Sequence, residues 1–137
     1  MRKGFTLIET LIYLALLAFV IGAGVSASYY IIDSSAKGKT EADTTREAEF
    51  LMRKIDWAMT GATAVNVGTM TITKGGPIKF EPDSDRARIT IGGSSEYLTS
   101  ERVRVTGLQF LPTSLPGITA SSTIDGKRFE ITKYIRK

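Results

Sequence analysis

Residues 10–32 form an uninterrupted apolar run, and this run limits the fold more than any other feature of the chain. It contains 23 residues with no charged side chain and no proline. A helix needs about 20 such residues to cross a hydrocarbon layer about 30 Å thick, and it satisfies its own backbone groups there. The 105 residues that follow are too few to enclose such a helix in a soluble core. The run therefore predicts a single transmembrane helix.

A cleaved secretory signal is the main alternative for this segment, because the chain has a basic start and small residues follow the apolar run. The run is longer than the usual apolar region of about 7–15 residues. Glu9 also lies within the first turns of the longer apolar segment 5–32, in which it is the one charged residue. A carboxylate costs about 2.5–3.5 kcal/mol at the centre of a membrane and less near its edge. Glu9 is therefore a candidate functional residue that needs a cationic partner.

Composition limits the chemistry of the chain. Its 137 residues include no cysteine and no histidine, and its net charge is +4. Cysteine ligands, thiolate nucleophiles and Ser-His-Asp triads are thereby excluded, and so are the usual zinc sites. The sequence has no glycine-rich phosphate loop. We expect that the chain is not an enzyme and that it binds no cofactor and no metal. One alternative is a calcium ion held by carboxylates near Asp83 and Asp85.

The start of the chain resembles the signal of type IV pilins and pseudopilins, through the run RKGFTLIE at residues 2–9 and the apolar segment after it. In that family a membrane peptidase removes a short basic leader that ends in glycine, and it methylates the new N-terminus. The resemblance implies cleavage between Gly4 and Phe5 and methylation of Phe5. It further implies that Glu9, together with Thr6, acts in filament assembly.

The physics of these positions agrees with that implication. Gly4 has no side chain, so a protease can approach the following bond closely. Cleavage leaves a cationic amine on Phe5, and methylation keeps its charge. An amine and a carboxylate about 4 Å apart attract by ~4 kcal/mol at an effective dielectric constant near 20. Glu9 can cap its own helix, but the family implies pairing with the Phe5 amine of a neighbouring subunit.

The implied protein is a minor pilin or pseudopilin of a type IV pilus-like or type II secretion filament. Many major pilins carry a proline in this helix, whereas this chain has none before Pro77. The segment 46–67 resembles the J-type tip subunit of secretion systems. The family implies a prepilin peptidase, other pilin subunits and membrane lipid as partners, with an assembly platform and an ATPase acting indirectly. It also implies an inner-membrane protein with a cytoplasmic N-terminus and a periplasmic or extracellular C-terminal part.

Two other functions are compatible with the sequence. The first is a single-span, signal-anchored β domain that binds a ligand outside the cytoplasm and never polymerises. The second is a DNA-uptake pilin, because four arginines alternate in pairs along two expected strands and can form a basic stripe. These residues are Arg86, Arg88, Arg102 and Arg104.

Residues 33–60 predict a second, amphipathic half of the same helix. Its apolar positions have the spacing of one helical face and comprise Ala48, Leu51, Met52, Ile55 and Met59. Gly38 is a candidate bend between the two halves. Gly61 is a helix stop.

The remainder, residues 61–137, alternates apolar and polar side chains in short runs separated by turn residues. We expect an α+β fold in which the long N-terminal helix packs on one small, mostly antiparallel sheet of five to seven strands. The pair Asp125-Gly126 predicts a hairpin turn. The expected parts are a leader at 1–4, a membrane and filament-core helix at 5–32, the amphipathic half at 33–60 and the sheet domain at 61–137. The aromatic and large apolar residues expected to pack inside are Phe50, Trp57, Phe80, Leu108, Phe110, Phe129 and Tyr134.

Overall fold

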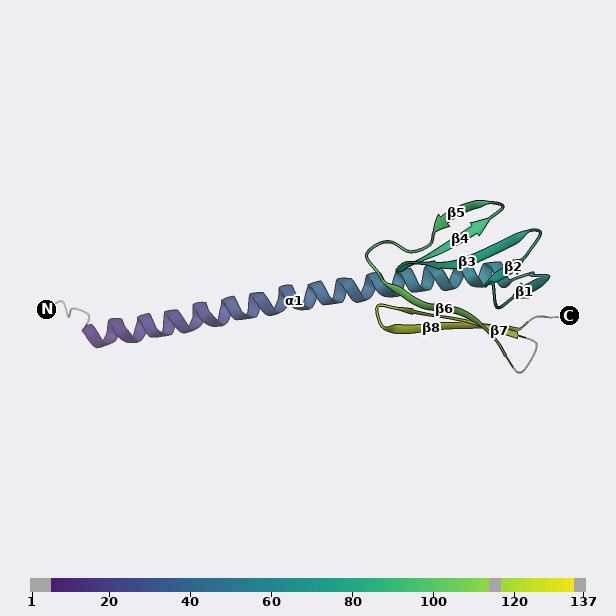
Figure 1. Cartoon of the computed structure of the whole chain (residues 1–137). Coiled ribbons are helices and arrows are strands. Elements are labelled where there is room, and N and C mark those ends of the chain that lie inside the picture. The colour runs from purple at the N-terminus through teal and green to yellow at the C-terminus, as the bar shows by residue number, and fades with distance from the viewer. Residues whose placement is uncertain (1–5, 114–116, 135–137) are drawn as a thin grey trace. The chain divides into compact units, whose positions relative to one another are not determined.

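The computed structural model describes residues 6–113 and 117–134. One helix, α1 (Leu7–Met59), precedes all the strands in these ranges (Figure 1). The chain divides into two compact units, Met1–Thr40 and Glu41–Lys137, and α1 contributes residues to both. The fold class is α+β, as the sequence predicts, with a long N-terminal apolar helix and antiparallel sheets packed on its later part.

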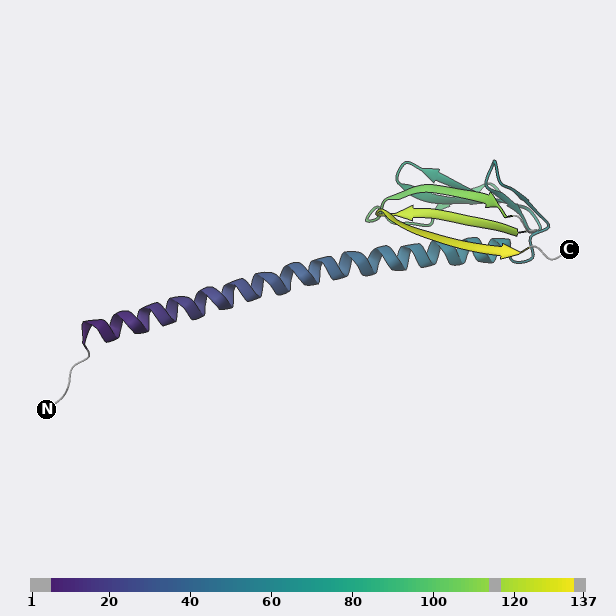
Figure 2. The same ribbon diagram turned by 90° about the horizontal axis from the view of Figure 1, so that it is seen from below.

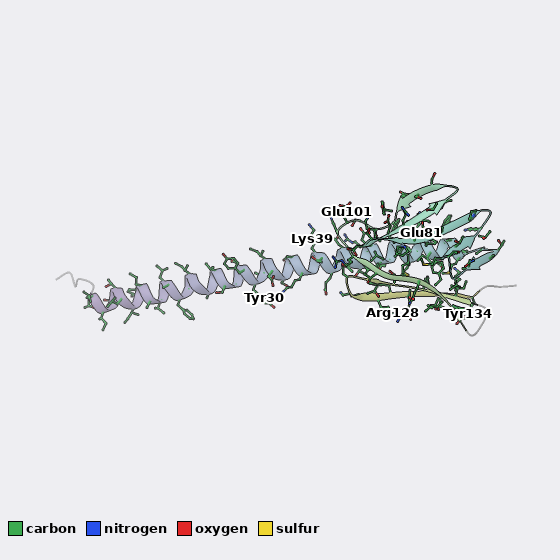
Figure 3. All side chains as sticks on the ribbon, in the orientation of Figure 1. Tyr30, Lys39, Glu81, Glu101, Arg128 and Tyr134 are labelled. Carbon is green, nitrogen blue, oxygen red and sulfur yellow. The ribbon has the colours of Figure 1, made fainter. Side chains whose placement is uncertain are left out.

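In the first unit, α1 begins directly after Thr6. The Thr6 carbonyl accepts the backbone N–H groups of Glu9 at 3.1 Å and of Thr10 at 3.3 Å, so Thr6 holds the N-cap position. None of the side chains from 7 to 32 is buried. Side chains that consist mostly of carbon, drawn in green, project all around this stretch (Figure 3). The helix continues through Gly38.

In the second unit, α1 buries one face against the sheets. The buried residues recur at helical spacing and are Thr44, Ala48, Leu51, Met52, Ile55, Ala58 and Met59. All five apolar positions that the sequence assigns to the stripe are in this set. The stripe is therefore confirmed, and burial of its side chains supplies much of the hydrophobic stabilisation of the unit.

The C-terminal end of α1 has no basic residue in its last turn, and cations from the sheets supply the missing charge. Lys74, between β2 and β3, donates from Nζ to the carbonyl of Trp57 at 3.0 Å. Lys133 on β8 donates to a carboxylate oxygen of Asp56 at 2.6 Å and to the Thr60 hydroxyl at 2.8 Å. Both ammonium groups lie where the helix dipole is negative. Gly61, with φ of +76°, follows the helix as the predicted stop.

Five antiparallel strands form the first sheet, in the order β1-β2-β3-β4-β5. They are β1 (Ala64–Asn66), β2 (Thr71–Thr73), β3 (Pro77–Asp83), β4 (Arg86–Ile91) and β5 (Ser94–Tyr97). Inward residues of β3 and β4 face each other in register, as in the pair Phe80 and Ile89. A two-residue turn at Gly92-Gly93, both with positive φ, joins β4 to β5.

Three antiparallel strands form the second sheet, in the order β6-β7-β8. They are β6 (Val105–Pro112), β7 (Gly117–Ile124) and β8 (Lys127–Tyr134). Asp125 and Gly126 have φ of +49° and +80° and form the turn of the β7–β8 hairpin, which confirms that prediction. The register of β6 and β7 shifts beside Gly107, whose φ is +64°. This is the geometry of a β-bulge.

Two expectations about the sheet are wrong. The described residues contain eight strands in two sheets, whereas the sequence predicted five to seven strands in one. The sheets adjoin where β6 lies near β3 and β4, and the rings of Phe80 and Phe110 meet there with centroids 5.9 Å apart. Figure 2 shows both sheets on the same side of the 41–59 part of α1. One core therefore joins the helix stripe to both sheets.

The prediction that seven large side chains pack inside is correct for Phe80, Leu108 and Phe110, which are buried. Phe129 is half-buried and packs against the core. The prediction is wrong for the other three, since Phe50 is 41% exposed, Trp57 48% and Tyr134 61%. Phe50 and Trp57 lie on α1 outside the buried stripe.

Candidate functional site

The four site residues predicted from the sequence are Gly4, Phe5, Thr6 and Glu9. Gly4 and Phe5 lie outside the described residues. Thr6 is exposed and caps the helix, and Glu9 is half-buried in its first turn. With Thr6 as N-cap, Glu9 occupies the third helical position.

The location of Glu9 has an electrostatic consequence. A carboxylate in the first turn of a helix lies near the positive end of the helix dipole, which stabilises it by about 0.3–1 kcal/mol at an exposed site. Within residues 6–113 and 117–134 the structure gives the Glu9 carboxylate no ion pair. The helix therefore orients Glu9 but leaves its carboxylate without a described cation.

The capping role of Thr6 was missed in the sequence analysis, although its signal was present. Thr6 and Glu9 have the threonine-to-glutamate spacing of a capping box directly before an apolar run. This spacing fixes the first helical residue as Leu7. It thereby also fixes how far Glu9 lies from the start of the helix.

A comparison with family models identifies this segment. Residues 1–25 match the model described as the prokaryotic N-terminal methylation motif. The chain carries the signature of type IV pilins and pseudopilins. No curated protein and no solved structure matches the chain. The pilin signature marks a structural class of protein rather than an enzymatic one.

The pilin motif coincides with the part of α1 that can enter a membrane. Of the described residues, α1 is the helix long and apolar enough to span one, and its most apolar window has no buried residue. Tyr30, labelled in Figure 3, projects from the helix near the end of the apolar run, a position that suits a ring at the membrane–water boundary. Motif and helix together give a membrane-anchored protein with a single span.

The expected basic stripe is not formed by strand residues alone, and most of its charge is neutralised. Arg86 and Arg88 lie on β4, but Arg102 and Arg104 lie in the segment before β6. Arg86 pairs with Glu101 at 3.2 Å and Arg104 with Asp85 at 3.1 Å, while Arg88 pairs with Glu81 and Asp83. These ion pairs leave little free positive charge along β4.

The acidic segment 81–85 also finds its partners within the sheet. A hydrogen bond from Lys79, aided by Arg88, lowers the pKa of Glu81 below its ordinary value of 4.5. Tyr97 donates its hydroxyl hydrogen to Asp83 at 2.8 Å, and this bond raises the pKa of Tyr97. Across the described ranges no three acidic side chains converge as metal ligands would. Asp83 and Asp85 instead contact different arginines.

Proposed function

We propose that this protein is a minor pilin or pseudopilin, assembled into a type IV pilus-like or type II secretion filament. The observation that carries the proposal is the methylation motif at residues 1–25, with Glu9 held in the first turn of the apolar helix. In this proposal a prepilin peptidase cuts between Gly4 and Phe5. Methylated Phe5 then becomes the N-terminus.

The proposed chemistry of assembly is charge pairing inside the filament core. The cleaved Phe5 amine is cationic near pH 7. An amine about 4 Å from a carboxylate offsets much of the cost of keeping Glu9 in an apolar medium, by ~4 kcal/mol at an effective dielectric constant near 20. The Phe5 amine of one subunit pairs with Glu9 of its neighbour, so that docking relieves an unmatched acid. This pairing sets the axial step between subunits, and Thr6 fixes the helix start that positions Glu9.

The parts of the chain then have separate roles. Residues 1–4 are the leader, 5–32 the membrane and filament-core helix, 33–60 its amphipathic half and 61–137 the displayed sheet domain. Before assembly the protein resides in the inner membrane with its N-terminus in the cytoplasm. Other pilin subunits are its partners in the filament, and a separate platform and ATPase supply the force for assembly.

The mass of the intact protein extracted from membranes tests this proposal. We expect the loss of residues 1–4 and the gain of one methyl group. In a Gly4→Val variant the new side chain obstructs the protease, so the leader is retained. Gly38→Ala is the matched control, because Gly38 has open space around its Cα and lies far along the helix. Retention of Met1 in the natural chain contradicts the proposal, and removal of the whole apolar run indicates a secretory signal instead.

A further inference from the structure

Two large aromatic side chains of the second unit lie exposed on α1, outside the buried stripe. Phe50 is 41% exposed and Trp57 is 48% exposed. Their spacing in the sequence places both rings on one face of the helix, about 10 Å apart along its axis. Both sheets lie on the same side of this part of α1, where they cover the stripe (Figure 2). The two rings thus stay partly in water, although large aromatic side chains gain from burial.

Two lysine ammonium groups lie beside the exposed rings. The Nζ atom of Lys54 is 5.6 Å from the centre of the Phe50 ring and 5.9 Å from that of the Trp57 ring. The Nζ atom of Lys74 is 4.5 Å from the centre of the Trp57 ring. Arg53, next to Lys54 in the chain, has an exposed side chain. We name these two aromatic and three basic residues the aromatic–lysine face.

The aromatic–lysine face carries a net positive charge. Arg53 pairs with Glu49 at 3.4 Å, so these two charges cancel. The neighbouring acid on α1, Asp56, is paired with a lysine of β8. Within residues 41–113 and 117–134, no acid forms an ion pair with Lys54 or Lys74. Two ammonium groups of the face are therefore available to anions from outside.

The residues just before this face on α1 leave its charge unchanged. Asp43 and Glu47 border a groove there, together with Arg46 and Arg102. The two acids balance the two arginines, so this end of the unit is neutral. The excess of positive charge is thus confined to the turns that carry the exposed rings.

The surface of a membrane is within reach of the aromatic–lysine face, because the same helix carries the membrane-spanning run. In a straight helix Phe50 lies about 27 Å beyond Ile32, so contact with the headgroups requires a bend. All side chains of residues 33–39 are exposed, so burial does not hold this connection straight. It contains Gly38, a poor helix former, and the two compact units divide next to it, after Thr40.

We propose that the aromatic–lysine face docks on the anionic headgroups of the membrane in which the chain is anchored. Lys54 and Lys74 pair with lipid phosphates, and their long stems let the ammonium groups stay in water. The rings of Phe50 and Trp57 enter the boundary between headgroups and acyl chains, where aromatic rings are favoured. The same face of a second copy is a poor occupant, because two positive faces repel each other. Docking needs the membrane anchor but not filament assembly.

The fluorescence of Trp57, the single tryptophan of the chain, tests the proposal. The full chain is reconstituted at low density into vesicles of phosphatidylcholine with brominated acyl chains, with or without phosphatidylglycerol. Bromine quenches a tryptophan ring that enters the lipid. We expect at least about twofold more quenching in the vesicles with phosphatidylglycerol, and loss of this difference at about 1 M salt.

Two double variants separate the face from the overall charge of the chain. Arg53→Gln/Lys54→Gln should lower the ratio of docked to undocked chains by about tenfold, since it removes two positive charges from the face. Arg104→Gln/Arg128→Gln removes the same charge from outside the face and should leave the ratio unchanged. All four side chains are exposed, so neither double variant disturbs the core.

The proposal is overturned if bromine quenches Trp57 equally in the two kinds of vesicle, or in neither. An equal loss of quenching in both double variants also overturns it. Acrylamide, a water-soluble quencher, detects cover by protein. Protection of Trp57 from acrylamide that rises with the number of chains per vesicle, without quenching by bromine, would assign the face to a second copy instead.

Discussion

Lys133, near the end of β8, lies with its ammonium nitrogen 2.6 Å from a carboxylate oxygen of Asp56 on α1. At the start of the same strand, Lys127 lies 3.1 Å from Glu41. The helical rise from Glu41 to Asp56 is about 22 Å, and the strand rise from Lys127 to Lys133 is about 20 Å. The two lengths match, so β8 is fastened along α1 at both ends. This holds the outer strand of the second sheet on the helix.

Replacing Lys133 by methionine should lower the free energy of unfolding by about 0.5–1 kcal/mol. The pair with Asp56 is partly exposed, which limits its value, but Lys133 also donates to Thr60. Urea unfolding of the full chain in detergent, followed by the fluorescence of the single tryptophan, Trp57, measures the change. Arg128→Met is the control, because its pair with Glu130 lies within one exposed strand. An equal loss in both variants contradicts a fastening role for Lys133.

Replacing Lys74 by methionine removes two contacts at once. Its Nζ caps the Trp57 carbonyl and lies 4.5 Å from the centre of the Trp57 ring. We expect a loss of stability of about 1 kcal/mol and a shift of the Trp57 emission maximum. Lys54→Met serves for comparison, since Lys54 lies 5.9 Å from the centre of the same ring but donates no hydrogen bond to the helix end among the described residues. Unchanged emission in Lys74→Met would show that the ammonium group does not contact the ring.

Ser122 on β7 is fully buried, and its hydroxyl has no hydrogen-bond partner within residues 6–113 and 117–134. Its neighbours on the same face, Ala120 and Ile124, belong to the apolar core. An unpaired buried hydroxyl costs about 1–3 kcal/mol, so Ser122→Ala should stabilise the protein by about 1 kcal/mol. Ser94→Ala, at an exposed position of β5, should be neutral. A destabilised Ser122→Ala variant would mean that the hydroxyl does have a partner.

Glu81 makes the stability of the sheet depend on pH. Its pKa is lower in the folded chain than the ordinary 4.5, because Lys79 and Arg88 favour its charged form. Its contribution is therefore complete above the unfolded pKa and is lost as the pH falls through the folded pKa. In Glu81→Gln the unfolding midpoint in urea should fall less steeply below about pH 4.5 than in the natural chain. Glu96→Gln, on the exposed strand β5, should retain the natural slope.

The local patterns of the sequence predict the helix stripe and the β7–β8 hairpin, because helical spacing and an Asp-Gly turn are short-range signals. No alternation of apolar and polar residues indicates the strand β5, since Ser94, Ser95 and Glu96 are polar and every residue of this edge strand is exposed. The two glycines before it, Gly92 and Gly93, form a turn within the sheet. The division into two sheets was missed for a similar reason, because pairing partners are not encoded in the alternation of single strands.

The candidate site shows the same limit. The motif at the N-terminus could be recognised from adjacent residues, and Thr6 could have been recognised as a cap from its spacing to Glu9. The contacts that shape the second unit join residues far apart in the chain, such as Asp56 with Lys133 and Glu47 with Ser100. The ion pairs of Arg86 with Glu101 and of Arg104 with Asp85 also join residues that are far apart in the chain, and they have no local signal.

The most direct test of the account is the incorporation of a Glu9→Gln variant into filaments, measured as the ratio of protein in the sheared filament fraction to protein in membranes. The change removes the charge and keeps the size of the side chain. We expect an unchanged level of the protein in membranes. The ratio of filament to membrane protein should fall by at least about tenfold, because the attraction to the neighbouring Phe5 amine is lost. Asp33→Ala, which removes an exposed acid beyond the apolar run, should assemble normally. Normal assembly of Glu9→Gln would contradict the account.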